Sequence, residues 1–365
     1  WFHGASVGEI MSIIPLIKYY EKKKSINQIL ITSSTLSSSK IIKKFKFKKT
    51  IHQFYPIDHF LLTNTFLNHW KPSLAIFIES EIWPYMFKNL KDKKIPLILL
   101  NARITKKTFN RWSKISFFSK LIFGMITVAY PQNLETKYFL KKIKTKKINR
   151  IGNLKFAENP EENFTIKNKK LKSELNKNKI WVASSTHKNE EIFCANAHKE
   201  LKKKNKNLIT IIIPRHVHRA NEIALEMKKI NLNVACHSSK IQTLKNIDIY
   251  IVDTYGETKQ FHKISSTVFL GGSIIKRGGQ NPVEAARLGS KILHGPNTDN
   301  FKDVYKHLKL LNISKKINTP LQLASSIVFK KNKNSGKKIK KIGQKILNKT
   351  INELDNLINN EFKKT

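Results

Sequence analysis

Cysteine is scarce in this 365-residue chain, which contains only Cys194 and Cys236. Neither cysteine has further metal-ligating residues at the spacing of a zinc site, and two cysteines are too few for a disulfide-rich secreted domain. Long apolar runs are also missing, because no stretch of about 18 apolar residues occurs. We therefore expect a reduced, cytosol-facing chain without a transmembrane helix, a signal peptide, a metal site or a cofactor.

Acidic residues are the second shortage. The chain has 25 Asp and Glu against 69 Lys and Arg, which gives a formal net charge of +44 at pH 7. Such an excess is typical of proteins that bind nucleic acid or anionic membranes. The basic residues are spread along the chain, however, as a compositional bias toward Lys, Asn and Ile would also produce. The charge alone leaves both explanations open and assigns no function.

Short apolar runs alternate with amphipathic segments along most of the chain. Continuous apolar runs between helices indicate parallel strands that are covered on both faces. In the first half we expect strands at 26–32, 73–79, 95–101 and 125–130, and in the second half at 180–186, 208–214, 232–236, 247–253, 267–272 and 291–295. The sequence therefore predicts an α/β fold with two Rossmann-like domains.

Domain boundaries are expected where the composition changes. A polar segment at 157–179 is predicted to be a linker with a marginal helix, between an N-terminal domain at 1–156 and a C-terminal domain at 180–335. Apolar residues at helical spacing predict a helical tail at 336–365. Because ligands of such folds bind at the carboxyl ends of the strands, we look there for functional residues.

A glycine-rich segment, GGSIIKRGGQNPVEAARLG, begins with Gly271 and Gly272 at the end of a predicted strand. The two glycines allow a tight turn, and we expect Asn281 as the N-cap, Pro282 as the first residue and Glu284 as the third residue of a helix. Free N–H groups at a helix start favour a phosphate, and a carboxylate there can accept hydrogen bonds from ribose hydroxyls. A turn followed by a self-capped helix explains the same residues, so both interpretations stay open.

Three more predicted strands of the second half end in polar residues. These residues are Ser185, Thr186 and His187 after one strand, Pro214, Arg215 and His216 after the next, and Gly256 and Glu257 after a third. A guanidinium or a hydroxyl at a strand end can hold phosphate or sugar oxygens, although helix caps and surface residues look the same in a sequence. Because the strands are predicted to share one sheet, their ends should converge, and this convergence favours a nucleotide site.

The first half contributes carboxylates. We expect Glu9 to open a helix, whose field should lower the pKa of its carboxyl and keep it ionised. An ionised carboxylate in a cleft can act as a general base toward a hydroxyl, and simple complementation of the helix dipole is the alternative. Glu79 and Glu81 follow an apolar strand and would point the same way if that strand continued. Lys155 lies just before the predicted linker, and spacing alone gives it little weight.

The motifs taken together resemble one family. The segments SVGE, ESEIWP, LLNARI, GNLKF, STHKNEE, PRH, VDTYGE, GGSIIKRGGQNPVEAARLG and GPNTDNFKD, in this order and spacing, resemble the 3-deoxy-D-manno-octulosonic acid (Kdo) transferases. The resemblance extends from Trp1 to about Asp303. It implies a GT-B fold, in which two Rossmann-like domains face each other across a cleft. It also implies inverting, metal-independent transfer of Kdo from CMP-Kdo to a lipid A precursor, lipid IVA, in lipopolysaccharide core assembly.

The resemblance also implies roles for residues of this chain. Glu9 would be the general base, and Glu79 and Lys155 would stabilise the transition state. CMP would be bound by Pro214, Arg215, Tyr255, Gly256, Glu257, Asn281, Pro282, Val283 and Glu284. Possible further donor or acceptor contacts are Ser6, Glu81, Ser185, Thr186, His187, Gly271 and Gly272.

Three positions depart from the pattern that the resemblance implies. Gln280 stands where His is usual, Tyr255 where Met is common, and Gly4 with Ala5 where bulkier residues are usual. None of these changes removes a catalytic carboxylate. We therefore expect them to alter donor affinity rather than abolish activity.

A membrane partner is also implied by the resemblance. The chain begins with Trp1 rather than Met, and family members carry an apolar and basic segment ahead of this point that holds them on the cytoplasmic face of the bacterial inner membrane. We expect peripheral association with anionic lipid, to which each basic residue near the surface contributes roughly 1 kcal/mol.

Two alternatives remain open at this stage. A GT-B transferase with a UDP donor would share the fold. A nucleic-acid-binding protein would explain the charge, but it predicts exposed aromatic residues interleaved with basic ones on one face. In this sequence the aromatic residues lie mostly within apolar runs, so we expect no nucleic-acid partner.

Overall fold

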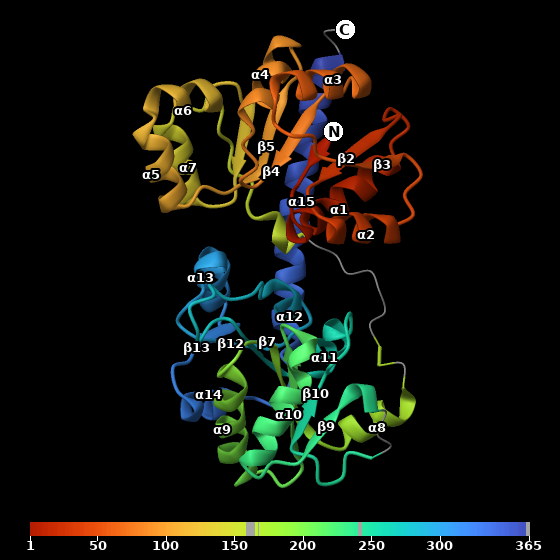
Figure 1. The fold of residues 1–365 in the computed structure, drawn as a ribbon, viewed down its shortest axis with the longest axis vertical. Helices are drawn as coiled ribbons and strands as arrows, with labels where there is room; N and C mark the ends of the chain where they lie inside the picture. The colour runs from red at the N-terminus through yellow and green to blue at the C-terminus, as the bar shows by residue number, and fades with distance from the viewer. Residues whose placement is uncertain (158–164, 167, 240–242, 363–365) are drawn as a thin grey trace. The chain divides into compact units, whose positions relative to one another are not determined.

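The computed structural model describes residues 1–157, 165–166, 168–239 and 243–362 (Figure 1). The chain divides into two compact units, one formed by Trp1–Pro160 with Lys341–Thr365 and the other by Glu161–Lys340. Each unit contains one parallel sheet covered by helices. The linker expected at 157–179 lies partly outside the described residues, and its described part contains helix α8 (Lys169–Asn176).

The first unit is built on a six-stranded parallel sheet with the order β3-β2-β1-β4-β5-β6. Its strands are β1 (Phe2–His3), β2 (Ile29–Ser33), β3 (Thr50–Phe54), β4 (Ala75–Ile78), β5 (Leu97–Ala102) and β6 (Val128–Pro131). Successive residues of a strand point to opposite faces, so Ile29 and Ile31 join one core cluster while Leu30 joins the other. The sheet is therefore buried on both faces, as its nearly continuous apolar strands predict.

Helices cover both faces of this sheet. On one face lie α1 (Val7–Glu21), α2 (Leu36–Lys44) and the last helix of the chain, α15 (Lys333–Phe362). On the other face lie α3 (Phe60–Trp70), α4 (Pro84–Asp92), α5 (Lys106–Lys114), α6 (Ser116–Phe123) and α7 (Leu134–Lys142). The short helix η1 (Leu154–Phe156) follows, with Leu154 in the same cluster as α1.

Helix α15 begins in the second unit, but its residues from Lys341 onward belong to the first. Ile351 and Leu354 are buried in the core beside α1. Asp355 accepts hydrogen bonds from Tyr19 Oη at 2.8 Å and from Lys23 Nζ at 2.6 Å. The helical tail expected at 336–365, of which 363–365 lie outside the described residues, is thus largely an integral part of the first unit.

The second unit contains a seven-stranded parallel sheet with the order β13-β12-β11-β7-β8-β10-β9. Its strands are β7 (Lys179–Thr186), β8 (Leu208–Pro214), β9 (Val234–Cys236), β10 (Ile249–Ile251), β11 (Thr267–Leu270), β12 (Lys291–His294) and β13 (Ser314–Lys316). The helices are α9 (Glu190–Lys202), α10 (Ala220–Lys229), α11 (Thr258–Ile264), α12 (Val283–Arg287), α13 (Lys302–Leu310) and α14 (Pro320–Ser326), with short 3₁₀ turns η2 (Val217–Arg219), η3 (His237–Ser239) and η4 (Asp299–Phe301). Two Rossmann-like α/β sheets are present as predicted.

The topology also confirms that the polar strand ends converge. Strands β11, β7, β8 and β10 are consecutive neighbours and all parallel, so the segments that follow them leave the sheet at one edge. In the first unit β1 and β4 are neighbours, which brings the segments after them together in the same way. None of the described helices is long and apolar enough to cross a membrane.

Candidate active site

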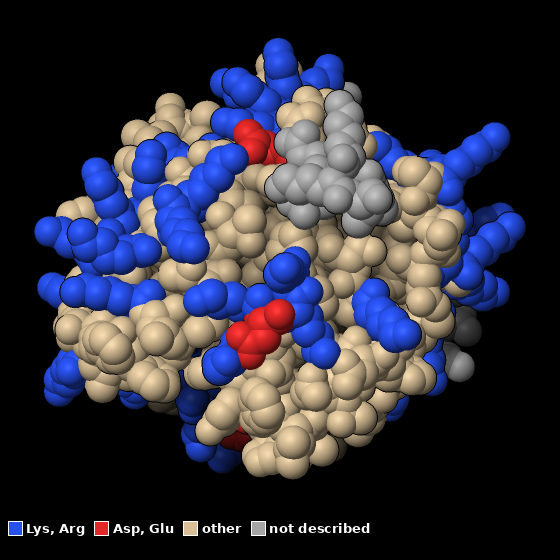
Figure 2. All heavy atoms as spheres, turned by 90° about the horizontal axis from the view of Figure 1, so that it is seen from above, with Lys and Arg blue, Asp and Glu red and all other residues tan. Residues whose placement is uncertain are grey.

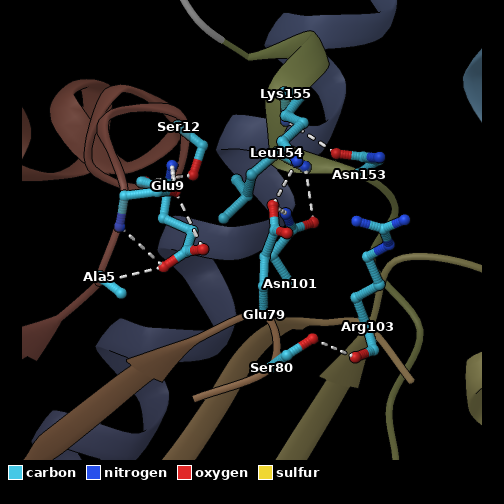
Figure 3. Close-up of polar contacts among 11 residues, drawn as sticks. Ala5, Glu9, Ser12, Glu79, Ser80, Asn101, Arg103, Asn153, Leu154 and Lys155 are labelled. Atoms are coloured by element: carbon cyan, nitrogen blue, oxygen red, sulfur yellow. Dashed lines mark hydrogen bonds and ion pairs between the residues drawn. The ribbon is translucent and has the colours of Figure 1, made fainter. Parts of the chain in front are cut away.

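Glu9 lies in the first turn of α1, directly after β1. Ser6 is the N-cap and forms a capping box with Glu9, in which Ser6 Oγ accepts from Glu9 N at 3.3 Å and Ser6 N donates to Glu9 Oε2 at 3.4 Å. Ser6 Oγ also donates to Glu9 Oε1 at 3.0 Å. The backbone N–H of Ala5 donates to Glu9 Oε2 at 2.7 Å (Figure 3). The predicted helix start is confirmed, and it holds the Glu9 carboxylate at the carboxyl end of the sheet.

The charge state predicted for Glu9 is wrong. The structure raises the pKa of this carboxyl to about 7 instead of lowering it. Burial is the main cause, and repulsion from Glu79 and Glu81 adds to it, while the hydrogen bonds from Ser6 and Ala5 oppose it less strongly. Glu9 is therefore poised to exchange a proton near neutral pH.

Glu79 is the residue after β4, and its backbone has a positive φ of 57°. Its carboxylate is buried and contacts Lys155 Nζ at 2.5 Å, while Asn101 Nδ2 donates to it at 3.4 Å (Figure 3). Asn101 Oδ1 in turn accepts from the backbone N–H of Leu154 at 3.0 Å, which ties β5 to the turn that carries Lys155. The Lys155–Glu79 pair is thus a fixed, buried ion pair.

Glu81 has different neighbours from Glu79, because the strand ends at Ile78 and the expected alternation does not continue. His3 Nε2 lies 3.1 Å from Glu81 Oε2, and Trp83 Nε1 donates to the same oxygen at 2.9 Å. His3 is fully buried, and its Nδ1 lies 2.9 Å from Thr32 Oγ1. Glu81 is therefore held by side chains at the ends of β1 and β4, near enough to Glu9 to affect its pKa.

In the second unit, Pro214 is the buried last residue of β8, and the exposed Arg215 follows it. The backbone N–H of Arg215 donates to the Thr186 carbonyl at 2.9 Å, which joins the ends of β7 and β8. Burial lowers the pKa of His187, and the positive charges of Arg215 and Arg277 add to this effect. Arg215 and Arg277 thus supply positive charge to the same place, beside His187.

The segment after β10 presents Tyr255 and holds Glu257. Tyr255 is 79% exposed. Glu257 Oε2 lies 2.8 Å from His237 Nε2 and also accepts from Thr254 Oγ1. His237 Nδ1 is in turn 2.7 Å from Tyr250 Oη. This chain of contacts fixes the Glu257 carboxylate, two residues after the exposed Tyr255.

The helix start predicted at Asn281 is one residue too early. Helix α12 begins at Val283 with Pro282 as the N-cap, and it is only five residues long. Asn281 Oδ1 still accepts from Val283 N at 3.1 Å. So short a helix has little dipole, and the argument for a phosphate at this point loses most of its force.

Glu284 contacts a lysine and a histidine of α11. Its carboxylate lies 3.4 Å from Lys259 Nζ and 3.5 Å from His262 Nδ1. Burial alone would raise the pKa of Glu284, but its contacts with His262 and Lys259 lower it below its usual value. Glu284 is therefore an anchored, ionised acceptor.

The N–H groups of Gly271 and Gly272 are already occupied. Gly271 N donates to the Ser184 carbonyl at 2.9 Å, and Gly272 N donates to the Glu190 carboxylate at 2.6 Å. The tight turn expected at these glycines is present, and neither N–H group is free to donate to a ligand. Of the other strand-end residues, Thr186 is buried, whereas Ser185 and His187 are partly exposed.

Sequence reasoning missed several residues that shape these sites, namely His3, Asn101, Arg103, His237 and Glu190. Arg103 N donates to the Glu79 carbonyl at 3.2 Å, and Figure 3 shows the Arg103 side chain extending from the strand end beside Asn101. Arg103 lies in the LLNARI motif, which was a usable signal. Glu190 lies in the STHKNEE motif, which was a signal of the same kind, whereas His3 gave none because its partners Thr32 and Glu81 are distant in the sequence. Among the described residues no cluster of three His, Cys, Asp or Glu side chains suits a metal ion.

Comparisons with known proteins point to one family. A family model described as 3-Deoxy-D-manno-octulosonic-acid transferase (kdotransferase) matches residues 1–158. The 3-deoxy-D-manno-octulosonic acid transferase of Rickettsia prowazekii is 34% identical over 346 residues, which are 93% of this chain and 73% of the relative. That of Haemophilus influenzae is 29% identical over 84% of this chain and 73% of its own length. A probable mitochondrial one from Arabidopsis thaliana is 33% identical over 90% and 76%.

Solved structures share the fold at low sequence identity. The UDP-GlcNAc 2-epimerase of Neisseria meningitidis, bound to UDP-GlcNAc, superposes with a TM-score of 0.62 at 13% identity and covers 100% of this chain and 99% of its own. A glycosyltransferase from Rickettsia africae superposes with a TM-score of 0.57 at 11% identity over 100% and 98%. These likenesses show the GT-B architecture alone.

Proposed function

The chain belongs to the 3-deoxy-D-manno-octulosonic acid (Kdo) transferase family, and we propose that it transfers Kdo from CMP-Kdo to a lipid A precursor with release of CMP. The observation that carries the mechanism is the position of Glu9. Its carboxylate lies at the carboxyl end of the first sheet, next to the Lys155–Glu79 pair, with a pKa of about 7. The reaction would be inverting and would need no metal ion.

In the proposed mechanism Glu9 removes the proton from the acceptor hydroxyl as that oxygen attacks the anomeric carbon of Kdo. A general base works best when its pKa is close to the operating pH, and Glu9 meets this condition. The fixed hydrogen bonds from Ala5 and Ser6 keep the carboxylate oriented without a rearrangement during the reaction. Both effects lower the barrier for deprotonating a sugar hydroxyl.

Glu79 and Lys155 are proposed to stabilise the transition state. As the bond to the leaving phosphate breaks, positive charge grows on the sugar and negative charge grows on the phosphate. The buried Glu79 carboxylate would stabilise the positive charge on the sugar, and the buried Lys155 ammonium would stabilise the negative charge on the phosphate. Both interactions are strong where water is excluded. Because the two groups hold each other in place at 2.5 Å, they are ordered before the substrate arrives.

CMP is proposed to bind at the carboxyl edge of the second sheet. Arg215 and Arg277 supply positive charge for the donor's phosphate, and Tyr255 offers an exposed ring for the base. Glu257, held by His237 and Thr254, and Glu284, held by Lys259, are acceptors for ribose hydroxyls or the cytosine amino group. Further contacts are assigned to Pro214, Gly256, Asn281, Pro282 and Val283.

Peripheral association with an anionic membrane belongs to the same proposal. On the face seen in Figure 2, Lys and Arg side chains are spread between uncharged areas and Asp or Glu side chains are few. The surface of α5 and α6 combines such charge with apolar side chains, because Ile115, Phe117, Phe118 and Leu121 are 52%, 80%, 52% and 46% exposed. The basic residues around them are Lys106, Lys107, Arg111, Lys114 and Lys120, and no Asp or Glu occurs from residue 93 to 134.

This α5–α6 surface suits a lipid headgroup region. Residues three and four apart on a helix are neighbours, so Leu121 of α6 lies beside both Phe117 and Phe118. Ile115 lies at the junction of α5 and α6. Apolar side chains surrounded by cations are the pattern of segments that lie in an anionic membrane interface. The same surface has the exposed aromatic residues that the nucleic-acid alternative predicted. Its aliphatic members favour lipid, because they cannot stack on bases.

The proposed function is tested by product analysis. Purified protein is incubated with CMP-Kdo and a lipid A precursor, and mass spectrometry follows the Kdo-bearing product and CMP. We expect both to form at equal rates, also with EDTA present. Calorimetry with CMP and UDP separates the UDP-donor alternative, because the proposal requires tighter binding of CMP. Product formation from a UDP-sugar, with none from CMP-Kdo, would refute it.

A further inference from the structure

The carboxylate of Glu190 is fully buried at the start of α9. Its Oε2 accepts from His187 N at 3.1 Å and from Gly272 N at 2.6 Å, while Oε1 accepts from Ser273 N at 3.1 Å and from Ile274 N at 2.9 Å. Converging backbone N–H groups of this kind form the nests in which proteins hold phosphate. The Glu190 carboxylate thus occupies the place of a ligand anion.

The loop that Glu190 binds is connected to the candidate CMP residues. The carbonyl of Gly272 accepts from Gly279 N at 2.8 Å, which closes the loop just before Asn281. Ser273 Oγ accepts from Gly295 N at 2.8 Å, which attaches the end of β12 as well. Displacement of the Gly272–Ile274 backbone would therefore shift Asn281 and its neighbours.

Three polar side chains surround Gly272. A Cβ atom placed on this glycine, whose φ is 66°, would lie 3.4 Å from Arg277 Cβ and from His187 Cδ2, and 3.5 Å from Gln280 Nε2. Gly272 is therefore packed against Arg277 Cβ, the His187 ring and the Gln280 amide, so that a shift of Gly272 would disturb these three residues. His187 is the member of this set on which the charges of both Arg277 and Arg215 act.

We propose that Glu190 is a positioning residue for the donor. It fills the nest of the Gly272–Ile274 backbone with the protein's own carboxylate and thereby leaves Arg215 and Arg277 to receive the donor's anionic groups. Because the loop is ordered before the donor binds, binding does not have to supply the free energy of ordering it. This inference rests on the proposed function, since it assumes a CMP-bearing donor at this edge of the sheet.

Calorimetric titration with CMP tests the inference on the full chain. The four backbone N–H groups of the nest need acceptor atoms, and in Glu190→Gln the side-chain NH₂ group offers them donors instead at one position. We expect the loop to be displaced and the Kd for CMP to rise about tenfold or more. In Glu190→Ala the Kd also rises, and added formate restores part of the affinity by refilling the nest. A purely structural role would lower Tm without changing the Kd of the folded protein.

Glu191→Gln is the matched control, because Glu191 is equally buried and adjacent but pairs with Arg219 and does not contact the loop. We expect it to lower Tm and keep the wild-type Kd. If the Gln and Ala variants do not fold, Glu190→Asp decides, with weaker CMP binding by a folded protein as the expected result. Unchanged affinity in the folded Glu190 variants overturns the inference alone. Absence of CMP binding by the wild type would instead overturn the proposed function.

Discussion

Glu9 shares its surroundings with two other carboxylates, Glu79 and Glu81, and its pKa of about 7 reflects burial together with their charge. We therefore predict that kcat/KM rises with pH around pH 7, as the base becomes deprotonated. Glu81→Gln removes one negative charge and should move this midpoint to lower pH. Glu200→Gln, on the exposed part of α9, should leave it unchanged.

The same pKa has a consequence for stability. Because the folded-state pKa of Glu9 lies above the usual 4.5, the folded protein binds more protons than the unfolded chain between about pH 4.5 and 7. The contribution of Glu9 to stability is therefore present at low pH and lost as the pH rises through 7.

A midpoint of the pH–rate profile near 4.5, or an unshifted midpoint in Glu81→Gln, would show that the surroundings of Glu9 do not control its ionisation.

The Lys155–Glu79 pair should be important for folding as well as for chemistry. Lys155→Met leaves the Glu79 carboxylate buried without its cation, for which we expect a loss of about 3 kcal/mol in unfolding free energy. Lys88→Met removes the exposed pair with Asp92 and should lose less than about 1 kcal/mol. Urea denaturation measures both. Equal losses would mean that the buried pair is no more valuable than a surface pair.

For single residues, the sequence predicted which residues form the site better than it predicted their surroundings in the fold. Glu9, Glu79 and Lys155 were identified from motifs, and the structure brings all three to the ends of neighbouring strands or the turn beside them. The direction of the Glu9 pKa shift was missed because its main cause is burial in the folded chain, and the carboxylates that add to it, Glu79 and Glu81, are about 70 positions away. The contacts of Glu190 were missed because its partners Gly272 and Ser273 are separated from it by 82 and 83 positions.

Among the elements, α15 makes an unusually close approach to η1 at Gly343. A Cβ there would meet the carbonyl oxygen of Phe156, a backbone atom that cannot move away easily. Gly343→Ala should therefore lose about 1–3 kcal/mol through overpacking. Gly8→Ala in α1 is the matched control, because nothing lies within 4 Å of its added Cβ, and we expect a neutral or slightly stabilising effect. Thermal unfolding of both variants checks this, and a stable Gly343→Ala protein would refute the close contact.

Strands with long apolar runs were predictable, whereas short or polar strands were not. All ten of these strands are present, and a first strand before Glu9 is present as the short β1, but β3 and β13 were missed. β3 and β13 lie at sheet edges and carry exposed residues. The sequence also placed the start of α12 one residue early. Asn281 accepts a hydrogen bond from Val283 N, as an N-cap residue would, but the helix begins only at Val283, after Pro282.

For the whole molecule, the charge of +44 and the α5–α6 surface predict binding to anionic vesicles. Phe117→Ser/Phe118→Ser should reduce co-flotation with phosphatidylglycerol vesicles and leave turnover of a short, detergent-dispersed acceptor unchanged. Leu310→Ser, which alters a 75% exposed side chain of the second unit, is the control. Flotation that is insensitive to the double substitution would exclude this surface, and retention on duplex or single-stranded DNA in place of vesicles would favour the nucleic-acid alternative.

The central claim is that Glu9 deprotonates the acceptor while CMP is held elsewhere in the chain. Single-turnover reaction of CMP-Kdo with the lipid A precursor, followed by mass spectrometry for wild type and Glu9→Gln, tests it most directly. Gln keeps the size of the side chain and accepts the hydrogen bond from Ala5, so the account predicts wild-type affinity for CMP and a rate lower by about 10² or more. Full turnover by Glu9→Gln, or a loss of CMP affinity that accounts for the lower rate, would contradict it.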